Sequence, residues 1–211
     1  MEERIAAACA RAGRRREEIT LVAVSKVFPA QAIREAYALG LRDFGENYVQ
    51  EFESKQPDLT DLPGARFHLI GHLQSNKSRR AAELFDVIQT IDTPKLARRL
   101  NEVGKPLEVM IEVKLSSEQT KSGVSAQDLP ALVEAVRGCS HLRLIGLMTI
   151  PPWSEDPEAS RPYFRRLREL ANAAGVSGLS MGMSHDFEIA IEEGATHIRV
   201  GTAIFGPRRV T

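Results

Sequence analysis

Short apolar runs alternate with amphipathic segments along most of the chain. We expect eight strands, at residues 20–25, 43–47, 67–71, 85–91, 107–113, 142–148, 178–182 and 197–200, of which 43–47 is short and ends in polar residues. Between them, apolar residues mostly recur every three or four positions, which is the period of a helix packed on one face. This alternation predicts an α/β fold with a parallel sheet, and eight units are the number that closes a (β/α)8 TIM barrel. A further amphipathic segment at residues 1–13 predicts an extra N-terminal helix that covers the bottom of the barrel.

Length and composition narrow the class of protein. At 211 residues, the chain can bury one sizeable core, and we expect a single domain over residues 1–211. Lys plus Arg and Asp plus Glu both number 28, which disfavours a nucleic-acid partner. No apolar run is long enough to span a membrane and no signal peptide begins the chain, so we expect a cytoplasmic protein. Cys9 and Cys139 lie in no metal-binding pattern, so no metal site is expected, and the balanced charge favours a monomer.

Lys26 follows the first buried strand, whose apolar run is Leu21–Val24. In parallel α/β folds, ligands bind at the carboxyl ends of the strands. A lysine at the edge of an apolar core can be partly desolvated, which makes its amine a nucleophile toward carbonyl groups. The alternative is that Lys26 is solvated, as most lysines are.

Other strands also end in polar residues that are candidates for a site. Asn47 follows the second strand and could cap a helix, contact a ligand or do both. His72, Asn76 and Lys77 cluster after the third strand, where each alone would be an ordinary loop or capping residue but together they indicate a contribution to a site. Met148 ends the sixth strand, a position where methionine more often belongs to the core.

The last two strand ends predict a phosphate site. In (β/α)8 barrels, the loops after strands seven and eight often hold phosphate. Here these loops contain Met183-Ser184 and Gly201-Thr202, which offer hydroxyl groups, backbone N–H groups and a close backbone approach at glycine. Arg199 points from the last strand toward the same end. A lysine together with a phosphate site suggests a ligand that carries both an aldehyde and a phosphate. Pyridoxal 5′-phosphate has both groups. A phosphorylated sugar on a Schiff-base aldolase also fits the spacing.

Several longer motifs resemble the pyridoxal phosphate homeostasis proteins. The motifs are AVSK at 23–26, FGENYVQE at 44–51, HLIGHLQSNK at 68–77, GLMTI at 146–150, LSMGMSHDF at 179–187 and RVGTAIFG at 199–206. They span nearly the whole chain in order. The resemblance implies a single barrel like the N-terminal domain of alanine racemase, with Lys26 as the lysine that forms the aldimine. It further implies that Arg199 faces the pyridine nitrogen, that the phosphate is held by Ser184, Gly201 and Thr202, and that the cofactor is lined by Asn47, Met148 and Met183.

Two functions remain open at this point. The first is a carrier that binds pyridoxal 5′-phosphate, buffers it and supplies it to apo-enzymes without substantial catalysis. The second is a pyridoxal phosphate-dependent amino-acid racemase. Arg199 carries a permanent charge, so it donates to the pyridine nitrogen and leaves it unprotonated, which weakens the ring as an electron sink. Racemases of this fold class also take a second acid/base group from another domain, for which the chain has no residues left. We therefore expect a carrier rather than an enzyme.

Overall fold

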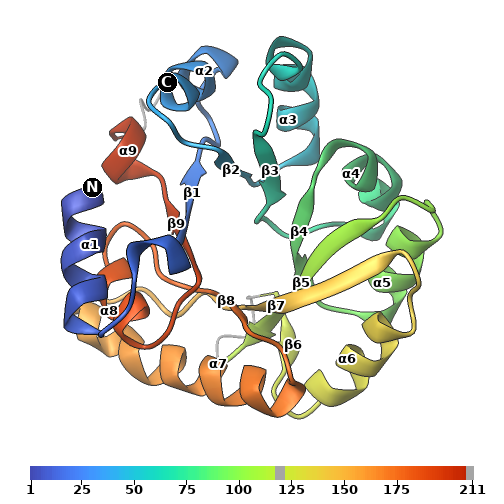
Figure 1. Cartoon of the computed structure of the whole chain (residues 1–211). Coiled ribbons are helices and arrows are strands. Elements are labelled where there is room, and N and C mark those ends of the chain that lie inside the picture. The colour runs from blue at the N-terminus through green and yellow to red at the C-terminus, as the bar shows by residue number, and fades with distance from the viewer. Residues whose placement is uncertain (117–121, 208–211) are drawn as a thin grey trace.

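The computed structural model describes residues 1–116 and 122–207, and within them eight parallel strands form a closed barrel inside a ring of helices (Figure 1). The barrel strands are β1 (Thr20–Val24), β2 (Asp43–Glu46), β3 (Arg66–Leu69), β4 (Val87–Ile91), β5 (Leu107–Lys114), β7 (Leu142–Met148), β8 (Gly178–Ser180) and β9 (His197–Val200). They are neighbours in chain order, and β9 pairs back onto β1 to close the barrel. The predicted (β/α)8 fold is therefore confirmed.

The helices follow the strands as the sequence predicts. They are α2 (Ala30–Ala38), α3 (Val49–Lys55), α4 (Ser78–Leu84), α5 (Pro94–Asn101), α6 (Leu129–Arg137), α7 (Arg161–Ala174), α8 (Phe187–Glu192) and α9 (Thr202–Phe205). Short 3-10 turns complete the connections: η1 (Arg16–Glu18), η2 (Gln56–Leu59), η3 (Ser75–Lys77) and η4 (Pro157–Ser160). The two-residue strand β6 (Val124–Ser125) pairs with β5 and was not predicted, because two residues show no periodicity.

The N-terminal helix α1 (Glu2–Arg11) exists as predicted, but it does not cover the bottom of the barrel. It packs beside α8 in the outer ring (Figure 1). Arg4 pairs with Glu188 at 2.9 Å, and its guanidinium lies 4.7 Å from the centre of the Phe187 ring. The physical reason is that α9 has four residues and leaves the outer surface there uncovered, so the apolar face of α1 is buried in its place.

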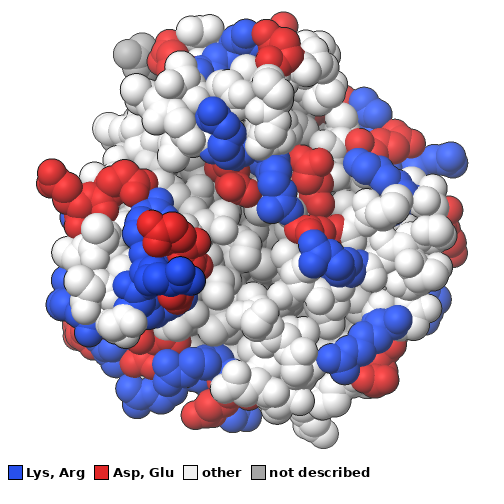
Figure 2. Space-filling view, in the orientation of Figure 1, with Lys and Arg blue, Asp and Glu red and all other residues white. Residues whose placement is uncertain are grey.

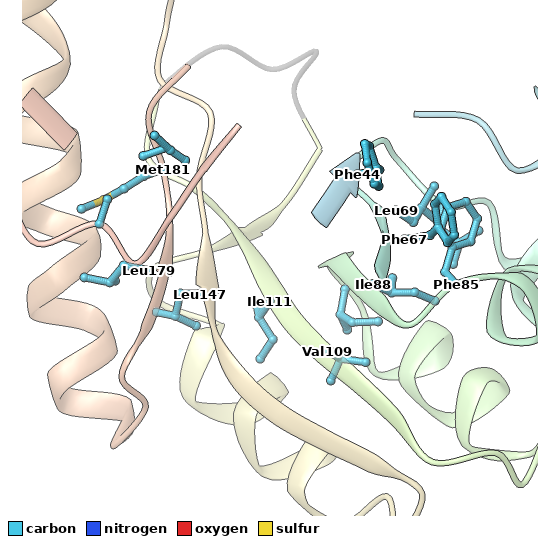
Figure 3. Packing of buried hydrophobic residues seen from close by; sticks show 14 of the residues in the cluster. Phe44, Phe67, Leu69, Phe85, Ile88, Val109, Ile111, Leu147, Leu179 and Met181 are labelled. Atoms are coloured by element: carbon cyan, nitrogen blue, oxygen red, sulfur yellow. The ribbon is translucent and has the colours of Figure 1, made fainter. Parts of the chain in front are cut away.

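The apolar core lies between the barrel and the helices (Figure 3). Side chains alternate along each strand, so that Leu21 and Ala23 of β1 join this core while Val22 faces the barrel interior beside Gly45. Phe52 of α3 packs against Phe67 and Phe85, with ring centres 4.6 and 4.7 Å apart. Burying large apolar side chains of this kind stabilises the fold by about 1.5–3 kcal/mol each.

Register places the candidate residues of β1 and β9 at one end of the barrel. Val22 is paired with Arg199, and Ala23 with Val200, so Lys26 and Gly201 both follow their strands on the same side. On the face shown in Figure 2, basic and acidic side chains are interspersed rather than separated by sign. Within the described ranges, no helix has the length and apolar character needed to cross a membrane.

Candidate functional site

A cleft opens at the carboxyl ends of the strands, where the sequence predicts a site. It contains about 1110 Å³ of empty space, part of which is open solvent. Ligand sites for small molecules typically occupy about 300–1,000 Å³, so the cleft can hold a molecule of cofactor size. Its lining combines one lysine and one arginine with hydroxyl, amide and apolar groups: Val24, Lys26, Phe28, Asn47, Ile70, Ile150, Trp153, Met183, Ser184, His185, Arg199, Gly201, Thr202 and Gly206.

Lys26 enters this cleft from the turn after β1, where its side chain is half-buried. Ser25 before it is fully buried, and the chain then turns outward through Val27 into α2. The apolar end of β1 therefore leaves the amine at the edge of the barrel core, as the sequence predicts.

The loop between β8 and α8 presents Ser184 through a turn that requires glycine. Gly182 has a φ of 89°, and a Cβ there would lie 2.5 Å from the Cβ of Ala190. Asp186 holds the following residues, because its carboxylate accepts the backbone N–H of Met183 at 2.7 Å. The hydroxyl of Ser184 is therefore carried by a fixed loop rather than by a free one.

The turn after β9 brings Gly201 and Thr202 to the same cleft. A Cβ at Gly201 would approach the carbonyl oxygen of Val24 to 3.2 Å, so a larger residue would crowd the end of β1. Glycine here keeps the two strand ends close and leaves backbone N–H groups accessible beside the Thr202 hydroxyl.

Arg199 forms the inner wall of the cleft and is 4% exposed. Its guanidinium donates to Ser180 Oγ at 2.7 Å and to the Thr149 carbonyl at 2.9 Å. Burial lowers the pKa of Arg199 to about 10, and the charges of Asp186 and Glu112 oppose that effect. The side chain is therefore still a cation and a hydrogen-bond donor at neutral pH.

A chain of hydrogen bonds continues from Arg199 across the barrel interior. Ser180 Oγ donates to Gln89 Oε1 at 2.6 Å, and Gln89 Nε2 lies 3.0 Å from His68 Nδ1. His68 Nε2 in turn lies 2.8 Å from the Asp43 carboxylate. Burial raises the pKa of Asp43, but the hydrogen bond from His68 and nearby positive charges outweigh it and lower that pKa.

The ionised Asp43 fixes the direction of this chain. A carboxylate only accepts, so His68 donates from Nε2; in the neutral imidazole Nδ1 then accepts, and Gln89 donates to it. Gln89 Oε1 then accepts from Ser180, whose oxygen accepts from Arg199. Every donor points from the guanidinium toward the carboxylate, so the two charged ends polarise the whole chain.

The structure brings together seven of the residues that the sequence singled out. Those lining the cleft are Lys26, Asn47, Met183, Ser184, Arg199, Gly201 and Thr202. Asn47 does not cap α3, since Tyr48 occupies the N-cap position.

Four other candidates lie away from the lining of this cleft. Met148 is fully buried at the end of β7. His72 is exposed and its Nδ1 lies 3.5 Å from Asp92 Oδ2, while Asn76 and Lys77 belong to η3. Their roles at a site stay predictions. The described residues contain no group of three or more side chains placed to hold a metal ion.

Several lining residues were not predicted as part of a site. Phe28, Trp153 and His185 each follow a strand end, which is the signal that could have identified them. Side chains of these types are also common in ordinary loops, so a place after a strand did not by itself mark them as site residues. His68, Gln89 and Ser180 were missed as well, although polar residues inside otherwise apolar strands are a recognisable signal.

Comparisons with known proteins agree with this architecture. The family described as "Alanine racemase, N-terminal domain" matches residues 2–209. A pyridoxal phosphate homeostasis protein of Pseudomonas aeruginosa is 50% identical over 211 residues, which cover 97% of this chain and 91% of that protein. The structure of PipY from Synechococcus elongatus with PLP bound matches at a TM-score of 0.86 and 41% identity, and the match covers 97% of this chain and 99% of PipY. Alanine racemase from Corynebacterium glutamicum, at 20% identity and a TM-score of 0.69, shares the fold over 60% of its length.

Proposed function

The chain belongs to the family of pyridoxal phosphate homeostasis proteins, and from this we propose that it binds pyridoxal 5′-phosphate in the cleft at the carboxyl ends of its strands. The observation that carries the proposal is that Lys26 shares one cleft with the hydroxyl groups of Ser184 and Thr202. The same cleft thus offers an amine for an aldehyde and hydroxyl donors for a phosphate.

The donor set of the cleft fits this cofactor. Ser184, Gly201 and Thr202 offer hydroxyl and backbone donors for the phosphate, and Arg199 offers a buried donor for the pyridine nitrogen. Asn47 and Met183 line the same cleft and are the expected contacts of the ring, whereas Met148 is buried outside the lining. The chemistry that the cofactor would supply is an aldehyde, and Lys26 would hold that group through its amine.

Arg199 favours storage of the cofactor over catalysis on it. Its guanidinium stays protonated at neutral pH, so it would donate a hydrogen bond to the ring nitrogen without giving up its proton and would leave that nitrogen unprotonated. An unprotonated ring withdraws electrons poorly and gives little stabilisation to a carbanion. We propose that the protein binds and buffers the cofactor and supplies it to apo-enzymes, without substantial catalysis of its own.

The covalent residue can be identified directly. We expect the purified protein to show the visible absorbance of a Schiff base, and borohydride reduction followed by peptide mass spectrometry to place the cofactor on Lys26. Lys26→Ala should remove this absorbance and most of the bound cofactor while the barrel still folds, because the side chain is half-buried at the rim. Lys77→Ala and Lys114→Ala are matched controls that should keep both. Label on either of those lysines in the wild type would contradict the assignment.

A second assay separates the carrier from the racemase. The holoprotein is incubated with a panel of L-amino acids, and turnover and chirality are followed. Enzymes typically turn over at about 1 s⁻¹ or faster, so such rates would contradict the carrier assignment. The expected result is no turnover, together with transfer of cofactor to an apo-enzyme in a mixing experiment.

A further inference from the structure

The turn that presents Lys26 contains an unfavourable backbone conformation. Val27 has a φ of 64°, and within residues 1–116 and 122–207 it is the only non-glycine residue with a positive φ. A β-branched residue in the left-handed region is a genuine outlier, because its Cβ crowds the backbone. The Val27 side chain is 58% exposed, so its own packing does not impose this conformation. Contacts made by the backbone must do so.

Glu51 supplies such a contact. The backbone N–H of Val27 donates to Glu51 Oε1 at 2.5 Å. Glu51 lies in the first turn of α3, and Lys55 one turn later donates to the same oxygen at 2.7 Å. The carboxylate that holds Val27 is therefore itself held in place.

The Lys55 ammonium extends the same network to the other side of Lys26. Its Nζ donates to Glu46 Oε1 at 2.9 Å and to the backbone carbonyl of Ser25 at 3.1 Å. The Ser25 hydroxyl donates to Glu46 Oε1 at 2.8 Å. Both neighbours of Lys26 are thus tied to one buried ammonium group.

This network is costly in free energy for the fold. Lys55 is 8% exposed and Glu46 is fully buried, and buried ion pairs often stabilise a protein no more than apolar residues of the same size would. Glu46 Oε2 has no hydrogen-bond partner among the described residues. Burial raises the pKa of Glu46, and the Lys55 ammonium opposes that effect. Buried charge beside a strained turn is typical of functional sites.

We infer that Glu46, Glu51 and Lys55 are positioning residues that hold the turn of residues 25–27 so that the Lys26 amine faces the aldehyde of the ligand. The inference rests on the proposed function, in which Lys26 bonds covalently to pyridoxal 5′-phosphate. Without the network, Val27 would relax to an ordinary conformation and the Lys26 side chain would leave the cleft in part of the population. Covalent binding would weaken, while contacts to the phosphate and the ring would remain.

Two ligands separate these effects. Pyridoxal 5′-phosphate has the aldehyde, whereas pyridoxine 5′-phosphate carries an alcohol in its place and cannot bond covalently to a lysine. Dissociation constants for both are measured with the wild type and with Glu51→Ala, Glu51→Gln, Val27→Gly and the double variant Val27→Gly/Glu51→Ala. Glu53→Ala is the matched control, because Glu53 is exposed on the same helix and pairs with Arg80 instead. Circular dichroism and thermal unfolding check that each variant folds.

We expect Glu51→Ala to bind the aldehyde about tenfold more weakly, the size of effect that relaxing one strained residue can produce, and to bind the alcohol within about twofold of wild type. Glu51→Gln keeps an acceptor oxygen and should stay close to wild type. Val27→Gly removes the steric cost of a positive φ, so the double variant should recover most of the lost affinity. Glu53→Ala should change neither ligand.

Three outcomes would overturn the inference. The first is an equal loss for both ligands in Glu51→Ala, which would make the network structural. The second is a double variant no better than Glu51→Ala, and the third is Glu51→Ala with unchanged affinity for the aldehyde. A wild type that binds both ligands equally and gives no covalent adduct would instead overturn the proposed function itself, and this inference with it.

Discussion

Gln89 is the central link of the hydrogen-bond chain inside the barrel, and replacing it with leucine tests whether that chain matters. Gln89 is fully buried and lies between His68 and Ser180, on the opposite side of the barrel from Arg199. Leucine is similar in volume but has no polar atom. Gln89→Leu therefore leaves the His68 Nδ1 acceptor and the Ser180 hydroxyl donor without partners in a site that water does not reach.

The expected cost follows from these two groups. A buried polar group that loses its partner costs about 1–3 kcal/mol, so two such groups cost roughly 2–6 kcal/mol of unfolding free energy. At about 2–4 °C per kcal/mol for a chain of this size, the melting temperature should fall by roughly 5–20 °C. Ser180 would also be free to rotate, so Arg199 would lose a fixed acceptor and the affinity for pyridoxal 5′-phosphate should fall several-fold.

Chemical denaturation followed by circular dichroism measures the first effect, and cofactor titration of the folded protein measures the second. Gln31→Leu is the matched control, because Gln31 is exposed on α2 and bonds to Glu35 at 3.0 Å. The control should stay within about 0.5 kcal/mol of wild type. An equally small change in the unfolding free energy and cofactor affinity of Gln89→Leu would refute the reasoning, since it would mean that the hydrogen-bond chain stabilises neither the barrel nor Arg199.

Three further expectations concern the phosphate, acid stability and release. Ser184→Ala or Thr202→Val should weaken binding of pyridoxal 5′-phosphate at least several-fold, because hydrogen bonds to a charged group contribute about 1.5–3 kcal/mol each. Binding of pyridoxal, which lacks the phosphate, should change little. Equal losses of affinity for the two ligands in calorimetry would contradict the assignment. Burial, with a smaller effect of neighbouring charge, lowers the pKa of His197 from 6.5 to about 4. As the pH drops from about 6.5 to about 4, the unfolded chain therefore binds a proton that the folded protein does not bind, and the free energy of unfolding falls. His197→Gln should remove part of that loss, at most about 3 kcal/mol, in unfolding curves measured from pH 7 to pH 4, and His141→Gln should not. Lys77→Ala should keep the Schiff-base absorbance but change the rate of cofactor transfer to an apo-enzyme in a salt-dependent way, and an unchanged rate at two salt concentrations would make Lys77 structural.

The fold could be predicted because its signals are local and repeated. Most barrel strands lie in short apolar stretches and most are followed by a helical stripe, so the eight units could be counted along the chain. The placement of α1 could not be predicted in this way. It depends on α9 having only four residues, which leaves the ring open beside α8, and no local pattern in residues 1–13 reports the length of a helix at the other end of the chain.

The sharing of one cleft by Lys26 and Ser184 could be predicted for a similar reason. Lys26 and Ser184 lie at strand ends, and strand ends of a parallel barrel converge on one face. The interior chain through Gln89 could not be predicted, because partners from β4 and β8 are joined only across the closed barrel. The same holds for Lys55, which reads as an ordinary residue in the last turn of a helix until the fold brings Glu46 beside it.

Under the proposed carrier function, the interior chain and the Lys55 network would have the same purpose, which is to orient the groups that hold the cofactor. A carrier must hold its ligand by a bond that an incoming amine can reverse, so its groups must be oriented firmly without being made more reactive. Arg199 is fixed by Ser180 at the inner wall, and Lys26 is fixed by its two neighbours at the rim. Both networks act on orientation, through hydrogen bonds to Arg199 and to the residues on either side of Lys26. Weakening either network should therefore change how tightly the cofactor is held but should not create turnover with amino acids. A Gln89→Leu or Glu51→Ala protein that gained racemase activity would show that orientation had been suppressing catalysis, and the carrier assignment would then need a different physical basis.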